Sequence, residues 1–104
     1  MAWQRIQIMT APRNWVIIKL LSDGKARRPS DMVRELKGEY KQANLYTAAW
    51  KLAAARVITP THVAKESGGF VVGYRLNPKL KGVVASLEKA EKNAARRLRR
   101  VLRR

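Results

Sequence analysis

The chain has 104 residues, a formal net charge of +16 and 46% hydrophobic residues, and it contains no cysteine. This length fits one domain with a modest core, and the absence of cysteine excludes disulfides and thiolate metal sites. No apolar run is long enough to cross a membrane. The strong positive charge favours a polyanionic partner, with nucleic acid ahead of an anionic membrane surface.

The first predicted helix follows a short N-terminal segment. Residues 1–12 are expected to form an arm or a short helix that packs on another element, because Trp3, Ile6 and Ile8 fit neither the helical nor the strand period. In the segment PRNWVIIKLLSDG, Pro12 stands near a helix start and Gly24 at its end. Apolar residues fall on almost every side of this helix, so we expect it to be buried.

A second and a third helix are predicted, separated by a short turn. Pro29 disfavours helix at Arg28, and Ser30 or Asp31 is expected to cap a helix that Gly38 ends. The turn GEYKQ then leads into the alanine-rich segment QANLYTAAWKLAAARVI, residues 42–58, which favours helix. Helical spacing predicts that its core-facing residues are Leu45, Tyr46, Ala49, Leu52 and Ala53.

Two residues of this third helix have two interpretations each. Asn44 is either the N-cap of a helix that begins near it or a free polar group. Trp50 is expected to be a partly buried anchor rather than a base-stacking residue. No acidic residue lies between Glu39 and Glu66. That depletion is expected if the third helix approaches a polyanion.

A β-hairpin is predicted after the third helix. β-Branched and aromatic residues fill the segments 57–64 and 70–76, and Gly68 and Gly69 supply the turn between them. Pro60 predicts that the first strand is an edge strand or is interrupted there.

The last helix is predicted to open at Asn77-Pro78 and to run to Arg104. We predict a homodimer through a heptad seam of this helix, formed by Leu80, Val84, Leu87, Ala94, Leu98 and Val101, with Glu91 in its middle. Six arginines occupy the last nine residues and are expected to surround the helix. Nucleic-acid contacts are expected from Arg96, Arg97 and Arg100.

Two helices joined by a short turn and followed by a hairpin form a recognisable pattern. Residues 13–77 resemble the winged helix-turn-helix DNA-binding family: YTAAWKLAAARVI looks like its recognition helix entering the first wing strand, and GYRLNPKLKGVV looks like the second strand entering the next helix. Arg56 stands where glycine is common. The long last helix adds a resemblance to small archaeal winged-helix chromatin proteins and regulators.

This resemblance implies a fold class that is mainly α with a small β-hairpin: an arm or helix over 1–12, a winged domain over 13–77 and a basic, dimerising helix over 78–104. It implies a dimer that binds double-stranded DNA as a transcriptional regulator or nucleoid protein. Base contacts in the major groove are expected from the start of the third helix, namely Gln42, Asn44 and Thr47, with Lys51 one turn later. Phosphate contacts are expected from Arg27, Arg28, Lys41, Lys51, Arg56 and, at the wing tip, Lys65.

Other classes of function stay open on the sequence. An RNA-binding structural protein, such as a ribosomal component, would suit the charge and would be monomeric. Winged helices also bind proteins, and the last helix could rest on a membrane surface, although its apolar face is rich in alanine. An enzyme is not expected, because His62 has no catalytic partners of predictable geometry. We expect a soluble cytoplasmic protein at the nucleoid, with no cofactor or metal.

Overall fold

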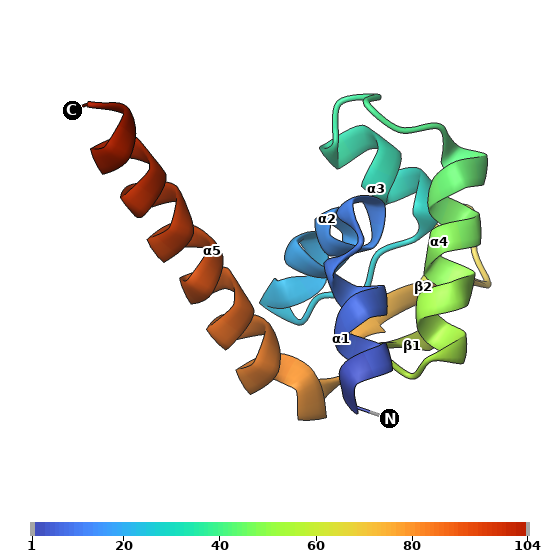
Figure 1. Cartoon of the computed structure of the whole chain (residues 1–104). Helices are drawn as coiled ribbons and strands as arrows, with labels where there is room; N and C mark the ends of the chain where they lie inside the picture. The colour runs from blue at the N-terminus through green and yellow to red at the C-terminus, as the bar shows by residue number, and fades with distance from the viewer. Residues whose placement is uncertain (1, 104) are drawn as a thin grey trace.

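The computed structural model describes the backbone of residues 2–103 and the side chains of residues 4–103. The side chains of Trp3 and Arg104 lie outside this described part. Figure 1 shows the order of the elements, which are α1 (Ala2–Thr10), α2 (Pro12–Leu20), the 3-10 helix η1 (Leu21–Asp23), α3 (Pro29–Glu35), α4 (Gln42–Ala54), β1 (Ile58–Ala64), β2 (Phe70–Leu76), the 3-10 helix η2 (Pro78–Leu80) and α5 (Lys81–Leu102).

One apolar core holds these elements together. It is composed of Met9, Trp15, Ile17, Ile18, Leu21, Met32, Leu45, Ala48, Ala49, Leu52, Val57, Ile58, Tyr74, Leu76, Leu80 and Val84. The fully buried side chain of Met9 brings α1 into this core, and the Asn14 side chain donates a hydrogen bond of 2.9 Å to the carbonyl of Ile8. The N-terminal segment is therefore a packed helix rather than an arm.

Helices α2 and α3 begin with a proline rather than with a capping side chain at the N-cap position. Pro12 and Pro29 each stand at the beginning of a helix, where the missing N–H costs nothing. The expected cap at Ser30 or Asp31 is wrong, because Arg28 holds the N-cap position of α3. Asp31 acts from inside the first turn instead: its carboxylate accepts the Arg28 backbone N–H at 3.0 Å.

Helix α4 buries a narrower face than the sequence pattern predicts. Leu45, Ala48, Ala49 and Leu52 are its core residues, whereas Tyr46 is 56% and Trp50 62% exposed. The expectations of a core Tyr46 and a packed Trp50 are therefore wrong. Successive side chains are about 100° apart around the helix axis. Tyr46, one position after Leu45, therefore points away from the side of the helix that is buried. Asn44 is no N-cap either, because Lys41 holds that position.

A left-handed residue joins α4 to the hairpin. Arg56 has φ +61°, a conformation that glycine adopts more readily, which agrees with its place at a position where glycine was expected. The Asn77 side chain donates to the Arg56 carbonyl at 2.9 Å, and the Asn77 backbone N–H donates to Val57 at 3.0 Å. These bonds tie the end of the hairpin to its beginning.

The hairpin forms as predicted, with its turn at Gly68 and Gly69, which both have positive φ. Pro60 lies opposite Tyr74 in the antiparallel register. The backbone N–H and C=O of Tyr74 point the other way, to Arg27, with two bonds of 2.8 Å. Pro60 therefore needs no N–H at this position, and β1 continues through it.

Helix α5 begins in the core and then leaves it. Leu80 and Val84 are buried and Leu87 packs against the core, whereas Leu98 and Val101 are 60% and 67% exposed. In Figure 1 the C-terminal part of α5 extends away from the other helices. Leu80 and Val84 thus belong to the protomer's own core rather than to a surface for a second chain. No helix in the described residues combines the length and apolar character needed to span a bilayer.

We predict that Gly73→Ala destabilises the fold by about 1–3 kcal/mol. A Cβ at Gly73 would lie 2.5 Å from Cγ2 of Val63 and 3.1 Å from the carbonyl oxygen of Arg27, so the Val63 side chain and the backbone at Arg27 would have to move away from β2. Urea unfolding followed by circular dichroism measures the change. The control is Gly82→Ala, which meets no atom within 4 Å; equal stability of the two variants would contradict the prediction.

Candidate nucleic-acid interface

The exposed side of α4 carries polar, basic and aromatic groups. Gln42, Asn44, Thr47 and Lys51 are all exposed, as predicted for residues that reach outward. The Thr47 hydroxyl donates to the carbonyl of Ala43 at 3.0 Å, which restricts its rotamer. The aromatic rings of Tyr46 and Trp50 share this exposed side, and they are the part of the surface that the sequence analysis missed.

A hollow of about 260 Å³ adjoins one edge of this side of α4. It lies between the start of α2 and α4, and it is lined by Ala11, Pro12, Arg13, Asn14, Thr47, Ala48 and Lys51. The fold thus brings Arg13 and Lys51 to one depression. Sequence spacing could not pair these two cations, because they are far apart along the chain.

The wing projects beyond the core with an exposed tip. Lys65 is exposed, and its backbone closes the turn through a 3.0 Å bond to Gly69 and a 3.1 Å bond from Gly68. The outer half of the hairpin also exposes apolar groups: Phe70 is 68% and Val72 53% exposed. The rings of His62 and Phe70 meet edge to face with centroids 6.3 Å apart.

Arg27 is a structural residue rather than a surface cation. Its Nε donates to Glu35 at 2.6 Å, and its two terminal nitrogens donate to Asp23 at 2.8 Å each. Its side chain is only 13% exposed. Its guanidinium is already bonded to carboxylates at all three nitrogens, so the predicted phosphate contact would have to replace these bonds.

Arg28 is paired as well. Its Nε and one terminal nitrogen donate to Asp31 at 3.0 Å each, and Arg34 donates to the same carboxylate. A phosphate contact by Arg28 would compete with this pair, so Arg28 is not the free cation that the sequence analysis expected. The signal was present in the sequence, since Asp31 follows Arg28 at the helical spacing of three.

These ion pairs lower the pKa values of the carboxylates that take part in them. Hydrogen bonding to Arg27 holds the pKa of Asp23 well below its usual range, and the same bonds to Asp23 and Glu35 raise the pKa of Arg27. Hydrogen bonding to Arg28 lowers the pKa of Asp31 to about 2. The carboxylates are thereby committed to the body of the protein around η1 and α3, while α4 from residue 42 to 54 contains none.

The arginines of α5 lie apart from α4. With about 3.6 residues per turn, Arg96, Arg100 and Arg103 project from the side of α5 opposite to Leu98 and Val101. Arg96, Arg97, Arg100 and Arg103 share one broad face, and Leu98 and Val101 share the other. Arg99 lines a hollow with Glu91 and Ala95, so the arginines extend around part of the helix rather than all of it. The fold does not bring them together with Gln42, Asn44 and Lys51, which lie across the core (Figure 1).

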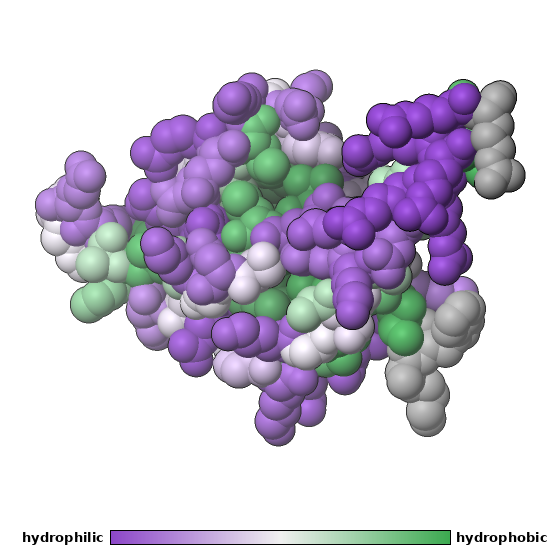
Figure 2. Space-filling view, turned by 90° about the vertical axis from the view of Figure 1, so that its left-hand side faces the viewer, coloured by the Kyte–Doolittle hydropathy of each residue, from purple (hydrophilic) through white to green (hydrophobic). Residues whose placement is uncertain are grey.

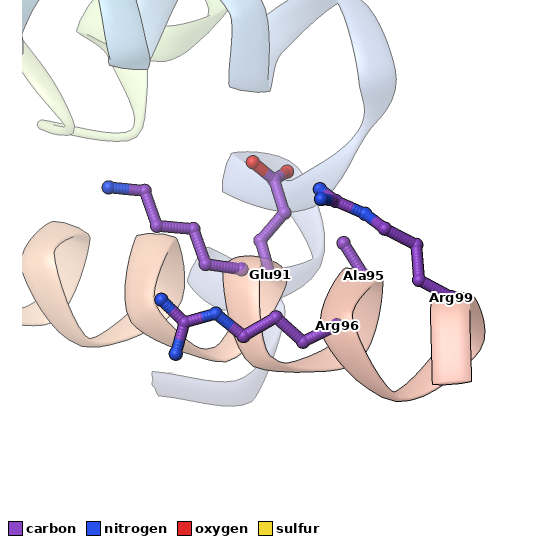
Figure 3. A pocket seen from close by; sticks show the side chains of 5 residues that line it. Glu91, Ala95, Arg96 and Arg99 are labelled. Atoms are coloured by element: carbon purple, nitrogen blue, oxygen red, sulfur yellow. The ribbon is translucent and has the colours of Figure 1, made fainter. Parts of the chain in front are cut away.

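Glu91 fixes the direction of α5. Its carboxylate accepts the indole N–H of Trp15 at 2.7 Å and the Lys19 ammonium at 3.3 Å, and Lys19 lies 5.9 Å from the centre of the Trp15 ring. The hydrogen bond from Trp15 is the main cause that lowers the pKa of Glu91. In Figure 3, Glu91 points from α5 toward the N-terminal helices, while Arg96 lies along α5 away from that contact. This acidic position in the predicted seam thus serves an intramolecular contact.

The described residues contain no group of three or more His, Asp or Glu side chains that could hold a metal ion. His62 lies exposed on the wing, with its ring against Phe70. The chemistry of the site is therefore that of a surface with cationic, amide, hydroxyl and aromatic groups.

The arrangement of α3, α4 and the β1–β2 hairpin defines a winged helix-turn-helix fold with a long C-terminal helix. No protein-family model and no curated protein matches this sequence. Among solved structures, a PadR-like transcriptional regulator from Bacillus cereus has a TM-score of 0.74 at 12% identity, over 92% of this chain and 96% of its own. A PadR-like transcription factor from Bacteroides fragilis has a TM-score of 0.67 at 20% identity, over 84% and 86%. At such identities the likeness shows the fold, and the predicted fold class is confirmed. Both proteins are bacterial, so the resemblance to archaeal chromatin proteins stays a prediction.

We predict that Asp31→Asn lowers the free energy of unfolding by about 1–2 kcal/mol at pH 7. The wild-type carboxylate has a pKa lowered from 3.8 to about 2, so its contribution is complete above pH 4 and is lost as the pH falls toward 2. Urea titrations between pH 2 and pH 7 should therefore show two stability curves that converge at low pH. The control is Glu39→Gln, an exposed acid. Curves that stay parallel down to pH 2 would contradict this prediction.

Proposed function

We propose that this protein is a DNA-binding transcriptional regulator that places α4 in the major groove of a duplex and its wing on the adjacent backbone. The observation that carries the proposal is the exposed side of α4: it is free of acids, it bears amide and cationic groups, and it lies beside a β-hairpin in a winged helix-turn-helix fold. The two proteins of like fold are described as transcriptional regulators.

Base recognition falls to the first two turns of α4. The amides of Gln42 and Asn44 can each donate to and accept from one adenine edge, and the Thr47 methyl group can pack on a thymine methyl. Each good bidentate contact discriminates against a wrong base by about 1–3 kcal/mol. Because Asn44 does not cap the helix, its amide is available for this role.

Phosphate binding falls to cations at the rim of the same surface. Lys41 begins α4, Arg13 and Lys51 line the hollow beside it, and Lys65 is at the wing tip. Contacts of this kind fix the position of the protein on the duplex and make binding depend on salt, with a slope of about −0.9 per phosphate. Trp50 and Tyr46 can pack against the sugar–phosphate edge of the groove, since their rings are exposed.

We further propose that two copies pair through the exposed part of the α5 apolar stripe. Ala94, Leu98 and Val101 continue the line that Val84 and Leu87 follow into the core, yet they contact nothing comparable within one protomer. Burying such side chains is worth about 25 cal/mol per Å². A second α5 offers the same stripe in return, which suits a symmetric homodimer.

Lys51→Glu should weaken duplex binding by at least about tenfold without loss of stability, because the exposed side chain would set a negative charge against the phosphates. Fluorescence anisotropy with a labelled duplex measures affinity, and thermal unfolding checks the fold. Lys25→Glu, an exposed cation outside the α4 surface, is the matched control. Equal loss in both variants would show an effect of net charge alone and would count against the α4 interface.

The same titration tests the RNA alternative. Competition by an RNA duplex at equal concentration should be weaker than competition by DNA, because the deep, narrow major groove of A-form RNA does not admit a recognition helix. Preferential competition by RNA, with a monomeric protein, would favour the structural RNA-binding protein instead.

Leu98→Asp should convert the dimer to a monomer while the fold stays intact, because Leu98 is 60% exposed in the protomer and would place a charge in the pairing stripe. Sedimentation equilibrium measures the mass. Asn93→Asp introduces the same charge on the other side of α5 and should leave the dimer unchanged. A wild-type protein that sediments as a monomer would refute the pairing.

A further inference from the structure

The end of α5 carries more positive charge than the α4 surface. Residues 92–104 contain seven cations and no acid, whereas residues 40–65 contain four cations and no acid. The function proposed for α4 and the wing therefore does not use the most strongly charged part of the chain, residues 92–104. Figure 2, which looks onto the α5 side of the molecule, shows hydrophilic side chains extending from the C-terminal end of α5 toward the viewer.

The arginines near this end form one accessible face. Arg96, Arg97 and Arg100, with Asn93, line a hollow of about 200 Å³ on α5 itself. Arg103 continues the same side of the helix and is exposed. Within the part of the chain that the structure describes, the ion pairs use Lys19, Arg27, Arg28 and Arg34. The guanidinium groups of this α5 face are thus free to bind an anion.

This arginine face points away from the α4 surface. The apolar stripe of α5 enters the core through Val84 and Leu87, so the opposite side of the helix faces outward. Helix α4 buries Leu45 and Leu52 in the same core, and its exposed side faces the other way. Figure 1 shows α4 and α5 on opposite sides of the molecule. One straight segment of duplex that lies against α4 cannot also contact the arginine face of the same protomer.

We propose that the arginine face of α5, formed by Arg96, Arg97, Arg100 and Arg103, binds the phosphates of a second DNA duplex, so that one protomer bridges two duplex segments. The proposal rests on the function proposed for α4. Arginine suits phosphate because its planar fork donates two parallel hydrogen bonds. Such contacts reach the backbone rather than base edges, so this second site takes duplex DNA without regard to sequence.

DNA fits this face better than a membrane surface does. A helix that lies on a bilayer needs a broad apolar side to insert among the acyl chains. In α5 the first part of that side is already in the core, and the exposed remainder, which contains Ala94, Ala95, Leu98, Val101 and Leu102, is the stripe that we assign to a second α5. A helix of 22 residues is about 33 Å long, which lets its outer half follow several successive phosphates.

Capture of one duplex by another tests the bridge. The full-length protein is added to a duplex fixed on beads, and retention of a second, fluorescent duplex is measured over a salt series. The test variant is Arg96→Gln/Arg100→Gln/Arg103→Gln. The matched control is Arg5→Gln/Lys25→Gln/Lys79→Gln, which makes the same change in net charge with exposed residues outside both faces. Circular dichroism checks that both variants stay folded.

We expect the wild type and the control to retain the second duplex, and the α5 variant to retain on the order of tenfold less. The dependence of its capture on salt should also be weaker: three phosphate contacts are lost, and each contributes about −0.9 to the slope of log affinity against log salt concentration. Capture by the α5 variant equal to that of the control would overturn the proposal, and the function proposed for α4 would still stand on the Lys51→Glu result.

Three further outcomes would also overturn it. If Leu98→Asp monomers lose capture although their arginine face is intact, the bridge comes from two α4 surfaces of a dimer. If the α5 variant loses all duplex binding while Lys51→Glu loses none, α5 is the single DNA site, and the function proposed for α4 fails as well. If the α5 variant keeps duplex capture and loses only its binding to phosphatidylserine vesicles, measured separately, the arginine face binds a membrane surface rather than DNA.

Discussion

The clamp around Arg27 sets the relative positions of the elements that form the α4 surface. Its guanidinium joins Asp23 in η1 to Glu35 in α3. Its backbone N–H and C=O both form hydrogen bonds with the backbone of Tyr74 in β2. One residue thus holds the first half of the helix-turn-helix against the wing. Bidentate arginine–carboxylate pairs are stronger and more directional than single contacts, and here the Arg27 side chain is 13% exposed while those of Asp23 and Glu35 are 41% and 42% exposed. Loss of this clamp would free α3 and the hairpin from one another, and α4 packs against both.

The pairing of charges in the body explains how so basic a chain folds. Four of the seven acids, Asp23, Asp31, Glu35 and Glu91, neutralise cations that lie between packed elements. Eleven of the remaining cations lie in two stretches of sequence that contain no acid, residues 40–65 and residues 92–104. Self-repulsion at these surfaces lowers the stability of the compact state, and an anionic partner would relieve it. The first stretch has four cations and the second has seven, and they lie on separate elements of the fold, which supports two separate contacts with a polyanion.

Local chemistry made much of the fold predictable. Pro12, Gly24 and the Gly68-Gly69 turn mark element boundaries by backbone preference alone, and the β-branched runs gave the hairpin. What the sequence could not supply was the width of the buried face of α4. Aromatic residues are assigned to a core by their transfer free energy, yet Tyr46 and Trp50 lie outside the arc that the packing of α2, α3 and β1 leaves available. The pairing of Arg27 and Arg28 was not anticipated for a different reason: acids four residues before Arg27 and three after Arg28 compete with any external phosphate. The α5 arginines needed only a helical projection to be placed on one face.

The left-handed backbone at Arg56 couples the stability of the fold to the charge beside α4. A residue with a Cβ in this conformation costs about 1–2 kcal/mol relative to glycine, and Asn77 holds the strained carbonyl in place. A single change to glycine would make the chain more stable and would also remove a cation from the junction of α4 and the wing. With arginine at this position, the folded state has a smaller margin against denaturation and one more positive charge next to α4. A thermostabilised form of this protein obtained through position 56 would then be a weaker ligand for polyanions.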